Sequence, residues 1–168
     1  MPTENERKYV LTDPAAVLAL WPQEDWDDVR QGYLPGDARI RRRTRGGRTT
    51  DSFTYKIDAA GRLIEIETTL EPRDFDDLWP LTTRRIHKLR RAVVDAHGLD
   101  WDIDLFLDED DRFYLAMAEC EMPEGMEAPP QVLPALAPLI RYPVPRERQT
   151  EFVNSRLADP KYVAGLSI

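Results

Sequence analysis

Residues 38–70 read ARIRRRTRGGRTTDSFTYKIDAAGRLIEIETTL and hold three strand-like runs separated by two turns. Gly46-Gly47 ends the first run and Ala60-Gly61 joins the second to the third, which predicts antiparallel strands over 38–44, 52–57 and 62–70. In the first and third runs, charged residues recur at every second position with isoleucine between them. Because side chains alternate between the two faces of a strand, each of these strands has a charged face and an apolar face.

The same alternation continues in other predicted strands. Strands are expected over 6–11, 29–34, 84–94, 101–107 and 112–122, and short helices after Asp13-Pro14, over 74–79 and around 131–140 and 150–157. The charged positions at spacing two in the remaining strands are Glu4, Glu6, Lys8, Lys88, Arg90, Asp102, Asp104, Glu119 and Glu121. Eight strands with a few short helices predict an α+β fold that is mainly antiparallel.

Two structures can hold such a charge pattern. One is a sheet with a solvated outer face, which usually mixes charges of both signs with neutral polar residues. The other is a closed barrel with a polar lumen and an apolar outside covered by helices. Each strand here tends to carry one sign, and like charges at this spacing need partners from neighbouring strands or from a ligand. Bases that hold phosphate oxygens and acids that hold a hard cation would together suit a polyanion and its metal.

Composition narrows the class of protein. The chain of 168 residues predicts a single domain over 1–168, and its net charge of −8 argues against a nucleic-acid binder. One cysteine excludes a disulfide framework or a thiolate zinc site, and Cys120 is expected to pack on the apolar side of its strand. No run approaches the length of a membrane span, and the polar start of the chain does not resemble a signal peptide, so a soluble cytoplasmic protein is expected. Arg42, Arg45 and Arg48 are expected to be solvated.

The motifs, taken in order, resemble those of the CYTH superfamily, the triphosphate tunnel metalloenzymes. Glu4-x-Glu6-x-Lys8 is similar to the N-terminal signature of that family, and the resemblance extends to about residue 158. The matching elements are Gln31-Gly32-Tyr33-Leu34, Arg39-x-Arg41, Thr54-x-Lys56, Glu65-x-Glu67, Leu78-Trp79-Pro80, Arg85 with Lys88-x-Arg90, Asp102-x-Asp104, Ala118-Glu119-Cys120-Glu121 and Asn154-Ser155-Arg156-Leu157-Ala158. Two features depart from the family: Leu63 and Ile64 precede Glu65 where a basic residue is usual, and Arg146-Glu147-Arg148 replaces a C-terminal Glu-Val-Thr.

The resemblance implies an eight-stranded closed β-barrel that forms a tunnel, with short helices packed outside. It also implies metal-dependent hydrolysis of a triphosphate with Mg²⁺ or Mn²⁺. This chain has the length of the short bacterial members of the family, which are most similar to inorganic triphosphatases. Inorganic tripolyphosphate, cleaved to pyrophosphate and phosphate, is therefore the expected substrate. A nucleotide or thiamine triphosphate would need groups such as Tyr33, Phe53 and Tyr55 at the tunnel mouth. A polyphosphate-binding module without turnover is a further alternative, as is RNA binding by residues 39–48, which the net charge disfavours.

The resemblance also implies roles for individual residues. The expected metal ligands are Glu4, Glu6, Asp104, Glu119 and Glu121. The expected phosphate-binding residues are Lys8, Arg39, Arg41, Lys56, Arg85, Lys88 and Arg90. Glu65 and Glu67 either orient the basic side chains or bind a second metal ion, and Asp102 is either a ligand or part of a structural ion pair. Whether Arg146 or Arg148 supplies a C-terminal phosphate contact, and whether the chain forms a homodimer, stay open.

Overall fold

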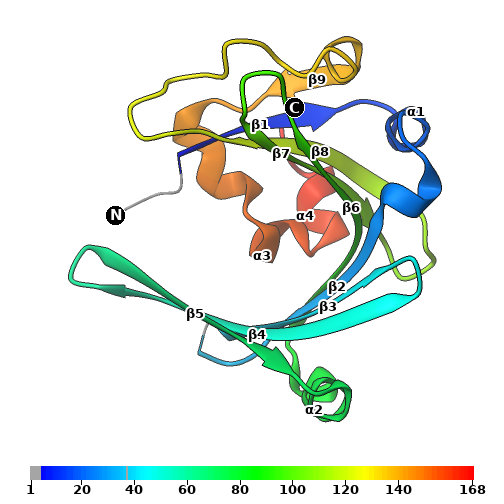
Figure 1. The fold of residues 1–168 in the computed structure, drawn as a ribbon, viewed down its shortest axis with the longest axis vertical. Helices are drawn as coiled ribbons and strands as arrows, with labels where there is room; N and C mark the ends of the chain where they lie inside the picture. The colour runs from blue at the N-terminus through cyan, green and yellow to red at the C-terminus, as the bar shows by residue number, and fades with distance from the viewer. Residues whose placement is uncertain (1–4, 37) are drawn as a thin grey trace.

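A computed structural model describes residues 5–36 and 38–168 and shows one strongly curved antiparallel sheet (Figure 1). The nine strands lie in the order β5-β4-β3-β2-β6-β7-β8-β1-β9. Their bounds are β1 Glu6–Leu11, β2 Asp27–Tyr33, β3 Ala38–Arg45, β4 Arg48–Ala59, β5 Arg62–Leu70, β6 Arg84–Val94, β7 Asp100–Leu107, β8 Phe113–Glu121 and β9 Ile140–Pro143. The helices are α1 Pro14–Leu18, α2 Pro72–Leu78, α3 Asn154–Leu157 and α4 Pro160–Ala164, with 3₁₀ helices η1 Gln23–Asp25, η2 Trp79–Leu81, η3 Ala137–Leu139 and η4 Arg146–Phe152.

The predicted alternation is confirmed, but the prediction of a closed eight-stranded barrel is wrong. The sheet has nine strands and is not closed: β5 and β9 form its two edges, and no ladder joins them within the described residues. The extra strand β9 pairs with β1 in the tail, next to the region 131–140 that was expected to be helical. Pro134 and Pro138 interrupt that region, and because proline lacks the backbone N–H, only the three-residue η3 forms there.

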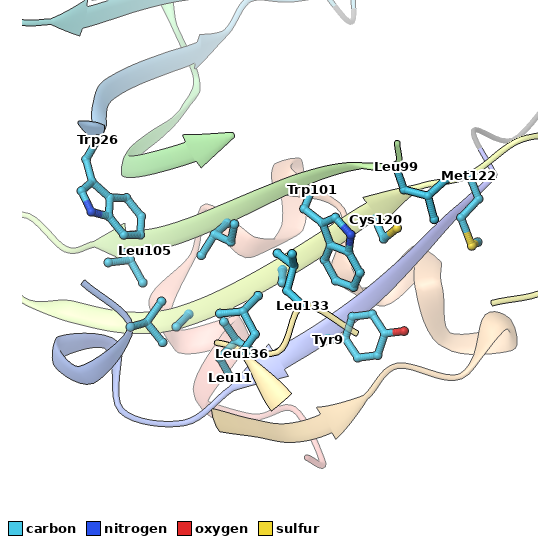
Figure 2. Packing of buried hydrophobic residues seen from close by; sticks show 14 residues of the cluster. Tyr9, Leu11, Trp26, Leu99, Trp101, Leu105, Cys120, Met122, Leu133 and Leu136 are labelled. Atoms are coloured by element: carbon cyan, nitrogen blue, oxygen red, sulfur yellow. The ribbon is translucent and has the colours of Figure 1, made fainter. Parts of the chain in front are cut away.

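The larger cluster of buried apolar residues, here called the convex cluster, lies on the outer, convex side of the sheet. Tyr9, Trp101 and Cys120 belong to this cluster, and Figure 2 shows them with Trp26, Leu133 and Leu136, which come from the connecting segments. Tyr9 and Trp101 stack with their ring centroids 5.7 Å apart. The prediction for Cys120 is confirmed, since the residue is fully buried in this cluster.

Helices cover both faces, so the prediction of helices only outside is wrong in part. α1 places Val17 in the convex cluster, whereas α3 and α4 lie inside the curve of the sheet (Figure 1). There Phe152, Leu157 and Val163 pack with Val10 and Phe106 in a second cluster. The C-terminal segment therefore fills one half of the concave side. None of the helices in the described ranges has the length and apolar character needed to cross a bilayer.

Arg42 anchors α2 to the convex face and is not solvated as expected. Its guanidinium donates two hydrogen bonds to the buried Asp51, at 2.8 and 2.7 Å, and one to Asp76 at 2.9 Å. The same group stacks 4.1 Å from the ring centre of Phe75 in α2. The pKa of Arg42 is raised because these carboxylates hydrogen-bond and attract it.

Arg42→Leu is expected to lower the free energy of unfolding by about 2–3 kcal/mol, because Asp51 would remain buried without its charged donor. For a chain of this size, the melting temperature should fall by about 4–12 °C. Arg48→Leu, an exposed arginine of the same hairpin, is the matched control and should change stability by less than about 0.5 kcal/mol. Equal melting temperatures for the two variants would contradict this role of Arg42.

Candidate functional site

A cavity of about 440 Å³ occupies the other half of the concave side. Four of the predicted phosphate-binding residues line it, namely Arg39, Arg41, Lys56 and Arg90. The acidic residues that line it are Glu6, Asp100, Asp102, Glu119 and Glu121, and Asn154 of α3 completes its polar wall. Residues from six strands and the C-terminal segment therefore meet at one place.

The register of the sheet explains how this meeting arises. Lys8 lies opposite Glu119, Arg90 opposite Asp104, and Lys56 opposite Glu65. At these three places a basic residue lies directly opposite an acidic one, on the same face of the sheet. The two acidic strands β7 and β8 are also neighbours, with Asp102 opposite Glu119, and these two carboxylates find their cations in Arg90 and Lys8.

Lys88, Asp104 and Arg90 form a buried ion network under the cavity. Lys88 Nζ donates to Asp104 Oδ2 at 2.7 Å, and Arg90 makes two hydrogen bonds to the same carboxylate at 2.7 and 2.6 Å. Lys88 is 1% exposed and Asp104 is 2% exposed. Burial by itself would raise the pKa of Asp104, but the charges of Arg90 and Lys88 outweigh burial and hold that pKa well below its usual range.

Burial has the opposite outcome for Lys88. Burial, reinforced by repulsion from Arg90, lowers the pKa of Lys88 to about 8. Neither Lys88 nor Asp104 lines the cavity. Lys88 and Asp104 therefore lie beneath the cavity, where Asp104 accepts two hydrogen bonds from Arg90.

Lys8 lies between two predicted metal ligands. Its ammonium is 2.8 Å from Glu6 Oε1 and 2.9 Å from Glu119 Oε1, and it is 5% exposed. Burial alone would lower the pKa of Lys8, but Glu119 and Glu6 together raise it. Two carboxylates from different strands thus converge on one cation.

Arg41 lies in an excess of positive charge. Burial, together with repulsion from Arg39, Arg90 and Arg43, lowers the pKa of Arg41 to about 10. Gln31, which is fully buried, orients this side chain by accepting a hydrogen bond from Arg41 Nε at 3.0 Å. Its amide nitrogen in turn donates to the Tyr33 hydroxyl at 2.8 Å. An anion in the cavity would relieve the repulsion among these arginines.

Glu65 and Glu67 lie at the outer side of the basic cluster and do not line the cavity. Glu65 is 3.2 Å from Lys56 Nζ and 3.6 Å from Arg39 Nη2. Glu67 accepts a hydrogen bond from Thr54 at 3.0 Å. These contacts favour the orienting role over a second metal site.

Three candidate arginines do not reach the cavity. Arg85 lies on the opposite face from Lys88 and Arg90, because it is an odd number of residues from both; it stacks on Trp79 and donates to Thr82. Arg146 donates to Asn5 and to backbone carbonyls of Met126 and Glu127. Arg148 forms a two-bond pair with Glu151. Arg85, Arg146 and Arg148 therefore do not line this cavity.

Sequence reasoning assigned no role to Gln31 or Asn154. Both lie within motifs that resemble those of the family, but a neutral amide gives no charge signal. Only the fold shows that Gln31 orients Arg41 and that Asn154 lines the cavity. Glu4, the first of the predicted metal ligands, lies outside the described residues.

The donor set is compatible with a hard divalent cation. Within the residues that the structure describes, no group of three or more metal-ligating side chains is close enough to hold an ion by itself. Glu6, Glu119 and Glu121 nevertheless line one wall of the cavity, and Glu6 and Glu119 already converge on a positive charge. Carboxylate oxygens are the ligands that Mg²⁺ and Mn²⁺ prefer, and Mg²⁺ commonly uses one or two carboxylates together with substrate phosphates.

Comparison with known proteins agrees with this architecture. No protein-family model matches the sequence, and no curated protein matches it. Among solved structures, the hypothetical protein NE1496 is 25% identical, with 93% of this chain and 97% of that chain covered and a TM-score of 0.58. A second structure, titled the inorganic triphosphatase NE1496, is 24% identical over 94% of this chain and 95% of that chain, with a TM-score of 0.56. The chain therefore shares the fold of these two structures, in agreement with the CYTH-like fold that its motifs predict.

Proposed function

We propose that this protein hydrolyses inorganic tripolyphosphate to pyrophosphate and phosphate in the cavity on the concave side of its sheet. The observation that carries the proposal is the lining of the cavity. Arg39, Arg41 and Lys56 of β3 and β4 form a basic wall, and Glu6, Glu119 and Glu121 of β1 and β8 form an acidic wall. Arg90 of β6 lies between the two walls, beside Asp102. The similarity to a structure titled an inorganic triphosphatase supports the same function.

The basic wall suits a small and highly charged anion. The planar guanidinium groups of Arg39, Arg41 and Arg90 match pairs of phosphate oxygens, and Lys56 adds a point charge. The buried Asp104 and the half-buried Asp102 hold Arg90 in place, with Arg90 Nη1 at 2.6 Å from Asp102 Oδ2. Fixed cations of this kind stabilise the charge that develops on a phosphoryl group during its transfer.

The acidic wall would hold the metal ion through Glu6, Glu119 and Glu121. A bound Mg²⁺ or Mn²⁺ supplies charge neutralisation on the phosphoryl group and lowers the pKa of water. The reaction forms a bond between a water oxygen and the attacked phosphorus and breaks one P–O–P linkage, and a proton is released as the phosphate products separate. Asp104 is not among the proposed ligands, because both of its oxygens accept hydrogen bonds from Lys88 and Arg90.

Among the aromatic residues of the described part of the chain, Trp101 lines the cavity, but it is 1% exposed and stacks on Tyr9. Tyr33, Phe53 and Tyr55, the aromatic residues considered for a base or a thiamine ring, do not line the cavity. The hydroxyl of Tyr33 is already engaged by Gln31. An organic triphosphate and a binding module without turnover are therefore alternatives that the assay must separate.

Phosphate release should be measured with tripolyphosphate, ATP and thiamine triphosphate at equal concentration, each with Mg²⁺, with Mn²⁺ and with EDTA. We expect rapid release from tripolyphosphate with a divalent cation, slower release from the organic triphosphates, and loss of activity in EDTA. Glu119→Gln should raise the metal concentration needed for half-maximal activity by about 10-fold or more. Phosphate release that persists in EDTA would contradict the role of the metal ion. No release from any of the substrates would contradict hydrolysis and favour the alternative of a binding module without turnover.

A further inference from the structure

The C-terminal segment closes one end of the concave side. Phe152, Leu157 and Val163 pack there against strand residues in a cluster whose members are each 7% exposed or less. The strand residues in contact with them are Val10, Ile86, Phe106, Leu115 and Met117. Figure 1 shows α3 and α4 lying within the curve of the sheet at this end. The charged cavity therefore has a closed inner end and does not continue as an open passage.

Asn154 stands at the boundary between the closed end and the cavity. It lines the cavity, and its Oδ1 accepts a hydrogen bond from Lys88 Nζ at 3.2 Å. The neighbouring carbonyl of Phe152 accepts one from Lys8 Nζ at 3.3 Å. Two buried ammonium groups from the sheet thus hold this part of the segment in place.

The contact with Lys88 determines what Asn154 can do. An ammonium group only donates hydrogen bonds, so the amide oxygen of Asn154 must face Lys88. The remaining group of the side chain is Nδ2, which carries two donors and no acceptor. Asn154 can therefore bind an acceptor such as a phosphate oxygen without giving up its contact with Lys88.

We propose that the cavity takes a linear polyphosphate end-on, with the terminal phosphoryl group at the closed end and Asn154 Nδ2 donating a hydrogen bond to it. This inference rests on the proposed function and names the part of the substrate that the site recognises. A terminal phosphoryl group has three non-bridging oxygens and more charge than an internal one, which suits the donors of Asn154, Arg90 and Arg41. Neither a ring nor the middle of a long chain has a terminal phosphoryl group to place at the closed end.

Thermal-shift titration can show whether binding follows the concentration of chain ends or of total phosphate. A ligand that binds the folded state raises the melting temperature according to its concentration relative to Kd. The ligands are tripolyphosphate, cyclic trimetaphosphate and two long-chain polyphosphates of different length, each with and without Mg²⁺. We expect the curves of the linear ligands to coincide when plotted against the concentration of chain ends. Trimetaphosphate should give a markedly smaller shift. Curves that coincide against total phosphate, or equal shifts from the ring and tripolyphosphate, would overturn the inference.

Asn154→Asp tests the residue itself, because it keeps the shape of the side chain and an acceptor for Lys88 but removes the donors. We expect KM for tripolyphosphate to rise by about 10-fold to 100-fold, with the melting temperature of the free protein preserved. Ser155→Ala, the next residue, is the matched control and should behave as the wild type. An unchanged KM in Asn154→Asp would refute the role of Asn154.

The two proposals fail in different ways. If the wild type hydrolyses tripolyphosphate but neither the ring nor Asn154→Asp behaves differently, end-on binding is wrong and the proposed function stands. If linear chains bind by their ends without phosphate release, the end-on inference stands and hydrolysis is wrong. If tripolyphosphate gives no thermal shift with or without Mg²⁺, both are overturned.

Discussion

Arg41→Met is expected to lower kcat/KM for tripolyphosphate by about 100-fold or more, while the melting temperature changes by only about 2 °C. The loss of activity follows because Arg41 lines the cavity beside Arg39 and Arg90, where phosphate charge must be neutralised. Removal of one charged donor at a phosphoryl group commonly costs two or more orders of magnitude.

Stability should respond to Arg41→Met in a different way from activity. Repulsion within the basic cluster and burial lower the pKa of Arg41, so its charge opposes folding. The variant relieves that repulsion but loses the hydrogen bond to Gln31, and we expect the two effects to offset each other. A variant that loses activity only because it unfolds would contradict this prediction.

Arg48→Met is the matched control for Arg41→Met. It removes the same charge from an exposed position of the same hairpin, away from the cavity. Steady-state kinetics at several salt concentrations will separate a general loss of positive charge from the specific loss at Arg41, because screening weakens the contribution of exposed charges most. Equal loss of activity in the two variants would show that Arg41 has no specific role.

Asp104→Ala is expected to lower the free energy of unfolding by about 3–5 kcal/mol, because it leaves Lys88 and Arg90 buried without their shared carboxylate. The melting temperature should fall by about 6–20 °C. Thermal or urea unfolding measures the change, and the double variant Lys88→Met/Asp104→Ala should recover part of it since one unpaired charge is removed as well. A double variant that is less stable than Asp104→Ala would contradict the buried pair.

The difference in stability between the wild type and Asp104→Ala should depend on pH. Because the folded protein holds the pKa of Asp104 below its usual range, the carboxylate contributes stability above the pKa of the unfolded chain, near 4. That contribution is lost as the pH falls toward the lower pKa of the folded state. The stability difference between the wild type and Asp104→Ala should therefore be full at pH 6 and should shrink below about pH 4. A difference that grows on acidification would refute the assignment.

The sequence located the strands well, because their pattern is local. The alternation of charged and apolar residues placed β1, β5 and β6 with the bounds that the structure has, and the turn at Ala60-Gly61 joins β4 to β5 as expected. Alternation also separates the faces of β6, so the outward position of Arg85 could have been found from its distance in sequence to Lys88. The tail was predicted less well, because β9 is only four residues long and depends on pairing with β1.

By itself the sequence determined which residues can share a face, which strands carry which sign, and the resemblance to triphosphate tunnel metalloenzymes, since all three follow from spacing along the chain. Only the tertiary structure decided which of the charges line a cavity and which lie beneath it. Lys88 and Arg90 occupy the same face of one strand, yet Lys88 is covered and Arg90 reaches the cavity. The physical reason is that Asn154 contacts Lys88 and Phe152 packs in one cluster with Ile86 of the same strand. Both residues are more than 60 positions away in the sequence, and no local pattern records such a contact.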